Sequence, residues 1–142
     1  MCNLIAASNE RAAQPDVEEP IPVLCIDEDP DSLVLLETSL EIDIGLCVST
    51  RSAIITGLPS IATEEHEPGG IIVAAPTLKQ NAYLIMQIRS IPKYRKIPII
   101  VIIGQADSWN KALYTHLEVR GIVVEPYDPV SLSKIVRAML GY

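Results

Sequence analysis

The sequence contains no phenylalanine, one tryptophan and five tyrosines, so a hydrophobic core must be built almost entirely from aliphatic side chains. Hydrophobic residues make up 49% of the 142-residue chain, which is enough for one domain with a sizeable core. The aliphatic residues gather in short uninterrupted runs. Such runs are typical of parallel strands that are covered on both faces of a sheet.

Cysteine is also scarce, with three residues and no Cys-x-x-Cys pair, which argues against a zinc site or a disulfide-rich secreted fold. We expect Cys25 and Cys47 to lie in strands as buried, reduced thiols. The longest apolar run, Ile97 to Ile103, is far too short to cross a bilayer. The N-terminus has neither the basic nor the apolar segment of a secretion signal. We therefore predict a cytoplasmic protein without a membrane partner.

A basic excess is missing as well, because the net charge is −7. The acidic excess lies in residues 1–31, whereas acidic and basic residues balance in the rest of the chain. This argues against a nucleic-acid partner, since nucleic-acid-binding proteins carry a basic surface. One short basic cluster, Arg89, Lys93, Arg95 and Lys96, follows a predicted helix end, and we interpret it as a solvated loop.

Hydrophobic periodicity divides the chain in two. Residues 1–19 show none, so we predict a flexible tail there and a folded domain over residues 20–142. In that domain five apolar strands alternate with amphipathic helices. The predicted strands are Pro22 to Ile26, Gly45 to Thr50, Gly70 to Ala74, Ile97 to Ile103 and Gly121 to Val124. The pattern predicts an α/β fold in which five parallel strands form one doubly wound sheet of the (βα)5, flavodoxin-like type.

Two of the predicted helices have a well-defined apolar face. The fourth helix carries Trp109, Ala112, Leu113, His116 and Leu117 at helical spacing, and the last carries Leu132, Ile135, Val136, Met139 and Leu140. The second helix is interrupted by Gly57 and Pro59. We therefore expect a kink or a late start in that helix.

The strongest chemical feature is a run of acidic residues that directly follows the first strand. Carboxylates crowded at the carboxyl end of a strand repel one another unless a cation is bound. Asp29 before Pro30 suits a helix N-cap with proline at the first helical position, and Asp31 suits the positive end of the helix dipole. Asp27 and Glu28 precede that cap. They are either the relic of a cation site or a working one, and Mg²⁺ suits one or two such carboxylates plus a phosphate.

From Pro22 to Leu140 the chain resembles the response-regulator receiver domain, the CheY-like phosphorylatable module of two-component signal transduction. In that family an acidic pair ends the first strand and binds Mg²⁺, and Asp27 and Glu28 match this pair. Pro98-Ile99-Ile100, which opens the fourth strand, and Glu125-Pro126-Tyr127-Asp128, which follows the fifth, match as well. The resemblance implies a flavodoxin-like fold and a role in signalling, for example in a phosphorelay.

The residue that the family phosphorylates is missing. That residue is an aspartate at the end of the third strand, where this chain has Ala74 and Ala75. No aspartate occurs between Asp43 and Asp107, so a different alignment cannot supply one. Because a methyl group cannot attack phosphorus, aspartyl phosphorylation at this position is excluded.

Three supporting groups of the family are missing too. The serine or threonine that ends the fourth strand falls at Ile103, and the aromatic residue of the fifth strand falls at Ile122. The lysine before proline falls at Glu125, which reverses the charge. Glu125 either adds a third carboxylate at this end of the sheet or turns outward into solvent. The resemblance therefore indicates a pseudo-receiver, a degenerate receiver without the phosphorylation switch.

The resemblance implies a single-domain signalling protein that is not an enzyme and acts by phosphorylation-independent protein–protein interaction. Its partner would be a histidine kinase, another regulator or a second copy of the chain. The predicted interface comprises the fourth helix, fifth strand and fifth helix, with Trp109, Tyr114, Ile122 and Tyr127 as its large side chains. Ordinary packing is the alternative for each of these residues. The only cofactor that this interpretation includes is a weakly held Mg²⁺ bound by Asp27 and Glu28.

An enzyme is the second interpretation of the acidic run. Asp27-Glu28-Asp29 also resembles the Asp-x-Asp of haloacid-dehalogenase-type phosphatases, where the first aspartate is the nucleophile and the second the general acid. Those enzymes also need a Ser or Thr, a Lys and a later acidic pair, whereas Asp107 alone follows the fourth strand here. An FMN-binding flavodoxin is a poorer interpretation, because an acidic loop after the first strand repels phosphate.

Overall fold

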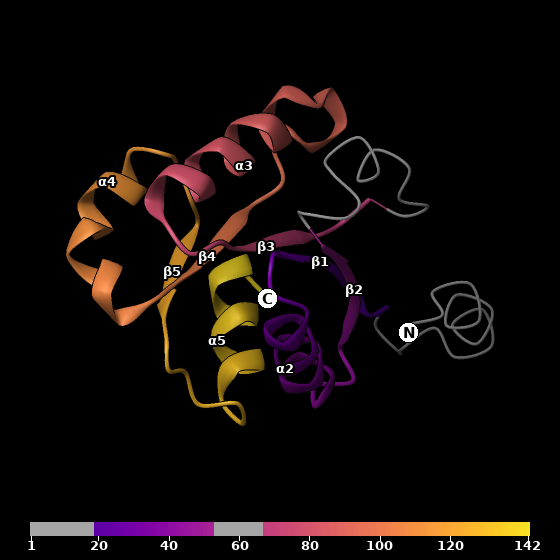
Figure 1. Ribbon diagram of the computed structural model, residues 1–142. Coiled ribbons are helices and arrows are strands. Elements are labelled where there is room, and N and C mark those ends of the chain that lie inside the picture. Colours follow the sequence, from indigo (N-terminus) through magenta and orange to yellow (C-terminus); the bar gives the residue numbers. More distant parts are fainter. Residues whose placement is uncertain (1–18, 53–66) are drawn as a thin grey trace.

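The computed structural model describes residues 19–52 and 67–142, which form a five-stranded parallel sheet with helices on both faces (Figure 1). The strands are β1 (Ile21–Asp27), β2 (Leu46–Ser52), β3 (Gly70–Ala74), β4 (Ile99–Ile103) and β5 (Gly121–Val124). Their order in the sheet is β2-β1-β3-β4-β5. The predicted α/β architecture is confirmed, and each predicted strand boundary is within two residues of the observed one. The predicted tail and the second predicted helix lie outside the described residues.

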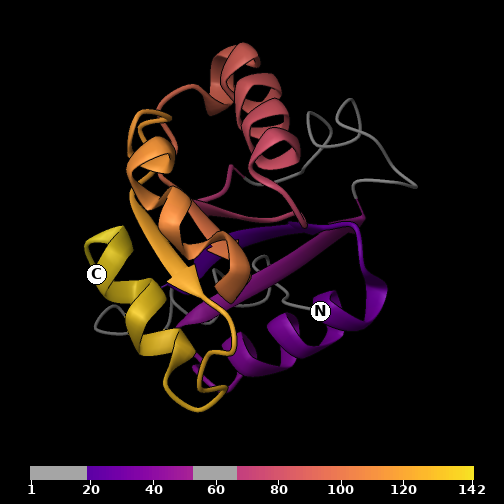
Figure 2. The ribbon, with the colours of Figure 1, turned by 60° about the vertical axis from the view of Figure 1, so that its left-hand side comes forward.

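Four α-helices belong to the described part of the chain: α2 (Pro30–Glu41), α3 (Leu78–Ser90), α4 (Lys111–Thr115) and α5 (Leu132–Leu140). Helices α2 and α5 cover one face of the sheet, and α3 and α4 cover the other (Figure 1; Figure 2). Two 3₁₀ helices, η2 (Pro92–Tyr94) and η3 (Gln105–Asn110), precede β4 and α4. Among the described helices, none has the length and apolar character needed to span a membrane.

The acidic run starts α2 as its sequence predicts. The Asp29 carboxylate accepts hydrogen bonds from the backbone N–H of Asp31 at 3.0 Å and from the hydroxyl of Ser32 at 3.1 Å. Pro30 is the first helical residue, where a missing N–H costs nothing. This confirms the structural role predicted for Asp29, and loss of such a cap typically costs about 1 kcal/mol.

The sheet separates the apolar side chains into two cores, because successive residues of a strand point to opposite faces. We call them the α2/α5 core and the α3/α4 core after the helices that cover them. The α2/α5 core includes Leu36, Leu40 and Val136, packed on alternate residues of the strands. The α3/α4 core includes Ile88 and the fully buried Tyr114. The uninterrupted aliphatic strands thus supply both cores, with little help from aromatic residues.

The two cysteines of the described strands differ in state. Cys25 is a free thiol in β1 and is fully buried, as predicted. Burial raises the pKa of Cys25, so the thiol stays protonated. The prediction of a reduced thiol is wrong for Cys47, because Cys47 is disulfide-bonded.

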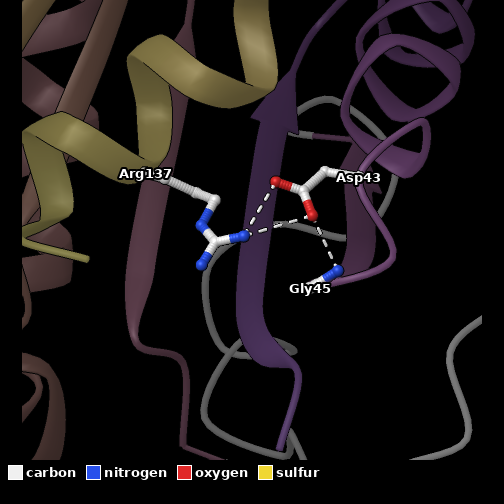
Figure 3. A network of polar contacts seen from close by, with 3 residues as sticks. All are labelled: Asp43, Gly45 and Arg137. Carbon is white, nitrogen blue, oxygen red and sulfur yellow. Dashed lines mark hydrogen bonds and ion pairs between the residues drawn. The ribbon is translucent and has the colours of Figure 1, made fainter. Parts of the chain in front are cut away.

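A polar network ties α5 to the turn between α2 and β2 (Figure 3). The carboxylate of Asp43 accepts a hydrogen bond from the backbone N–H of Gly45 at 2.7 Å and pairs with the guanidinium of Arg137 at 3.2 Å. A Cβ at position 45 would lie 2.8 Å from Nη1 of Arg137 and 3.0 Å from Oδ1 of Asp43. Glycine therefore allows the turn and the ion pair to approach this closely.

Candidate functional site at the carboxyl ends of the strands

A pocket of about 140 Å³ opens at the carboxyl ends of the strands, next to α2. Its lining residues are Asp27, Ser32, Leu35, Leu36, Ala74, Ile102, Glu125, Pro126 and Tyr127. A second hollow of about 200 Å³ shares Asp27, Ala74 and Glu125 with it. We call the two together the acidic mouth. These residues lie at the carboxyl edge of the sheet, where the sequence predicted the site.

Asp27 is the most buried acid of the mouth, with 6% of its surface exposed. One carboxylate oxygen accepts a hydrogen bond from the backbone N–H of Asp29 at 3.0 Å. Burial raises the pKa of Asp27 to about 6, and the negative charges of Asp29 and Glu125 act in the same direction. Asp27 is therefore a carboxylate that the fold holds in an unfavourable place for its charge.

The acidic pair predicted from the sequence is divided by the structure. Glu28 does not line the mouth, because its carboxylate accepts a hydrogen bond from the side-chain amide of Gln80 in α3, at 3.3 Å. Instead of Glu28, Glu125 lines the mouth together with Asp27. The peptide bond from Glu125 to Pro126 is cis. Within residues 19–52 and 67–142, no group of three or more Asp, Glu, His or Cys side chains could hold a metal ion. The described carboxylates alone thus make a poor ligand set for a cation.

The two candidate acceptor positions carry alanine in different surroundings. Ala74 pairs with Asp27 in the β1–β3 register and lines the mouth. Ala75 packs in the α3/α4 core, and its backbone N–H and C=O both bond to the side chain of Asn81, at 2.9 and 3.2 Å. Neither position offers a nucleophile to the mouth.

The other two degenerate positions are apolar and packed. Ile103 is 1% exposed and belongs to the α3/α4 core, so the side chain that lines the mouth at the end of β4 is Ile102. Ile122 is partly buried against the same core. Neither isoleucine can donate a hydrogen bond to a phosphoryl group at the mouth.

Tyr114 is not an exposed interface residue, and the prediction for it is wrong. Its side chain is fully buried. Its hydroxyl donates a hydrogen bond to the Asp107 carboxylate at 2.6 Å and accepts one from the amide of Asn81 at 3.1 Å. Burial, with the hydrogen bond to Asp107, raises the pKa of Tyr114 to about 12. Because both polar partners lie in the fold, the tyrosine can point inward at little cost.

These contacts form a hydrogen-bond chain from the mouth to η3, buried at Asn81 and partly buried at Asp107, and sequence reasoning missed it. The chain runs from the backbone of Ala75 through Asn81 and Tyr114 to Asp107, which also accepts from the amide of Asn110. One signal was available in the sequence. Asn81 stands on the same helix face as Leu84, and a polar residue on an apolar face needs a buried partner.

The predicted apolar face of the fourth helix is also wrong. Trp109 is 86% exposed and Leu113 is 51% exposed. Helical spacing does not apply over this stretch, because η3 holds Trp109 and α4 has only five residues. Of the predicted interface residues, Trp109 is exposed, Ile122 is partly buried, and Tyr127 lies at the mouth instead. The four residues therefore do not form one continuous surface.

Solved structures of other proteins share this architecture. No family model matches the sequence, and no curated protein matches it either. Among solved structures, the chemotaxis response regulator CheY4 of Vibrio cholerae is 18% identical and has a TM-score of 0.69 over 84% of this chain and 98% of that one. A putative response regulator from Chloroflexus aurantiacus is 21% identical, with a TM-score of 0.72 over 87% and 100%. The chain has the fold of a receiver domain.

A third similar structure allows a comparison with the acidic mouth of this receiver fold. The receiver domain of a sensor histidine kinase from Pseudomonas aeruginosa is 17% identical, with a TM-score of 0.65 over 87% of this chain and 99% of that one, and has a magnesium ion coordinated in its active-site cleft. In the present receiver fold, no lysine or arginine among the described residues lines the mouth. The charged side chains that line the mouth are therefore all carboxylates, those of Asp27, Asp29 and Glu125.

Proposed function

We propose that this protein is a receiver-like signalling protein that binds a protein partner and is not itself phosphorylated. The observation that carries the proposal is Ala74, which lies opposite Asp27 at the mouth where the reacting carboxylate of a phosphorylatable receiver would be. Glu125 supports it, because a carboxylate replaces the cation that would offset phosphoryl charge. We propose a histidine kinase, another regulator or a second copy of the chain as the partner.

The partner surface that we propose is centred on Trp109 and Leu113. Both are large, exposed and apolar, and they lie four residues apart on η3 and α4. Exposed tryptophan is the residue type most often responsible for binding energy at protein interfaces. The hydrogen bonds that Asp107 accepts from Tyr114 and Asn110 hold this segment on the α3/α4 core, so the surface is ordered before a partner arrives.

We propose a weak Mg²⁺ site whose ligands differ from the acidic pair that the sequence predicted. Asp27 and Glu125 share the mouth, whereas Glu28 is hydrogen-bonded to Gln80. We therefore expect Mg²⁺ binding to depend on Asp27 and Glu125 and to tolerate Glu28→Gln. A phosphatase of the Asp-x-Asp type is less compatible, because the second aspartate, Asp29, already caps α2 and is not free to act as a general acid.

The proposal is tested by incubating the full chain with acetyl phosphate and Mg²⁺ and measuring its intact mass. We expect no gain of a phosphoryl group. A gain that is labile to hydroxylamine would overturn the proposal, and its loss in Asp27→Asn would identify that residue as the acceptor. A receiver domain with an intact phosphorylation site serves as the positive control.

A further inference from the structure

A second concavity of about 620 Å³ lies at the opposite end of the sheet from the acidic mouth. It opens where β4 and β5 begin, since Pro98 precedes the first residue of β4 and Arg120 precedes the first residue of β5. Both residues line it, together with part of the basic cluster that the sequence suggested was a solvated loop. We call this concavity the basic groove.

Four cationic side chains line the basic groove: Arg89, Arg95, Lys96 and Arg120. Three of them are neighbours in the sequence, but Arg120 is brought in by the sheet from the connection between α4 and β5. A single carboxylate, that of Glu118, lines the groove with them. Such a concentration of positive charge is unexpected in a chain with a net charge of −7. Like charges held together cost stability unless an anion is bound.

Arg89 organises the loop that presents two of the other cations. One of its guanidinium nitrogens donates hydrogen bonds to the carbonyl oxygens of Arg95 at 2.9 Å and Ile97 at 2.6 Å. In contrast, the side-chain nitrogens of Arg95 and Lys96 form no hydrogen bond or ion pair with any described residue, and both residues are exposed. Arg89 thus fixes the loop, while the side-chain charges of Arg95 and Lys96 remain available to a ligand. Such preorganisation lowers the entropy cost of binding.

The backbone of the groove contains the one non-glycine residue with positive φ among the described residues. Glu118 has a φ of 58°, in the left-handed region, where a residue with a side chain costs roughly 1 kcal/mol. Its backbone N–H bonds to the carbonyl oxygen of Thr115 at 3.1 Å, which closes the turn after α4. Strained backbone of this kind is found preferentially at ligand sites.

We propose that the basic groove binds a small molecule that carries a multiply charged phosphate group. Guanidinium groups match phosphate oxygens in geometry and charge. Arg95 and Arg120 present guanidinium groups that do not hold the loop, and Arg120 donates only a long hydrogen bond, of 3.5 Å, to the carbonyl oxygen of Met139. The groove has the size of ordinary small-molecule sites, which are about 300 to 1,000 Å³. Leu117 and Val119, both partly buried, supply an apolar wall for the body of such a molecule. An acidic protein segment fits less well, because the cations converge on one concavity rather than following an extended surface.

This site is independent of the proposed signalling function, since it shares no residue with the acidic mouth or with the exposed pair Trp109 and Leu113. Titration of the full chain with pyrophosphate, followed by calorimetry and by backbone amide NMR at about 150 mM salt, tests it. We expect saturable binding, with amide shifts confined to residues near 95–98 and 117–120. Inorganic phosphate should bind more weakly, because it carries less charge.

Matched variants decide where the anion binds. We expect Arg95→Gln and Arg120→Gln each to weaken pyrophosphate binding at least tenfold, and Glu118→Gln to strengthen it several-fold. Lys111→Gln, which removes an exposed cation outside the groove, should leave the affinity unchanged. Equal weakening by Lys111→Gln and Arg95→Gln would overturn the proposal in favour of non-specific charge screening. Absence of saturable pyrophosphate binding would also overturn it, and binding of a glutamate-rich peptide in that case would assign the groove to an acidic protein segment.

Discussion

The charge of Asp27 should destabilise the folded protein at neutral pH. Burial raises its pKa from the ordinary value of 3.8 to about 6. A carboxyl whose pKa is higher in the folded state binds its proton more tightly there, so stability falls as the pH rises from about 4 to about 6. The difference between the two pKa values corresponds to about 3 kcal/mol once the pH is well above both.

Replacing the carboxylate by an amide should therefore stabilise the protein. Asp27→Asn keeps an oxygen that can accept the hydrogen bond from the backbone N–H of Asp29 and removes the charge. We expect the free energy of unfolding to rise by about 3 kcal/mol at about pH 7.5 and by about half that at about pH 5. Urea denaturation in the presence of EDTA, followed by circular dichroism, measures the difference at each pH.

The control for this experiment is Asp128→Asn. Asp128 is an exposed acid whose pKa is lowered, mainly by the hydrogen bond from the hydroxyl of Ser131 and also by the backbone N–H of Val130. Its charge is therefore favourable in the folded state, and its removal should not stabilise the protein at any pH. If Asp27→Asn changes stability by the same amount at both pH values, or destabilises at both, the buried-charge explanation is wrong.

Three further substitutions test the rest of the structure. Tyr114→Phe removes a buried hydroxyl with two partners and should cost about 1 to 3 kcal/mol in urea denaturation, whereas Tyr83→Phe, at an exposed tyrosine, should cost nothing measurable. Gly45→Ala should cost about 1 kcal/mol because its Cβ would crowd Arg137, and a cycle with Arg137→Gln should be non-additive. Trp109→Ala should change stability by less than about 0.5 kcal/mol but weaken binding of the signalling partner at least tenfold, measured by pull-down with purified components.

The strands could be predicted from the sequence because their signals are local, and the parallel sheet because the strands alternate with helices. Uninterrupted aliphatic runs such as Gly70 to Ala74 are long enough for a strand and too short for most helices. The start of α2 was predictable for the same reason, since Asp29 and Pro30 act within one turn. The lack of a nucleophilic side chain at positions 74 and 75 was also determined by the sequence, because both residues are alanine whatever the fold.

The tertiary structure alone decided which side chains share a site. Asp27 and Glu28 are adjacent in the sequence, but only Asp27, the last residue of β1, lines the mouth, because the Glu28 carboxylate is hydrogen-bonded to Gln80 of α3. Tyr114 was predicted to be exposed and is buried, since its hydroxyl bonds to Asp107 nearby and to Asn81, which is distant along the chain.

The same reason separates the two charged regions of the molecule. The acids at the mouth were visible in the sequence because Asp27 ends one strand, β1, and Glu125 directly follows another, β5. The basic groove was not, because Arg120 joins Arg95 and Lys96 only when β4 and β5 pair side by side. Local sequence determines which residues form each element, whereas the pairing of elements far apart in the chain determines which charges meet, and no short-range pattern records that pairing.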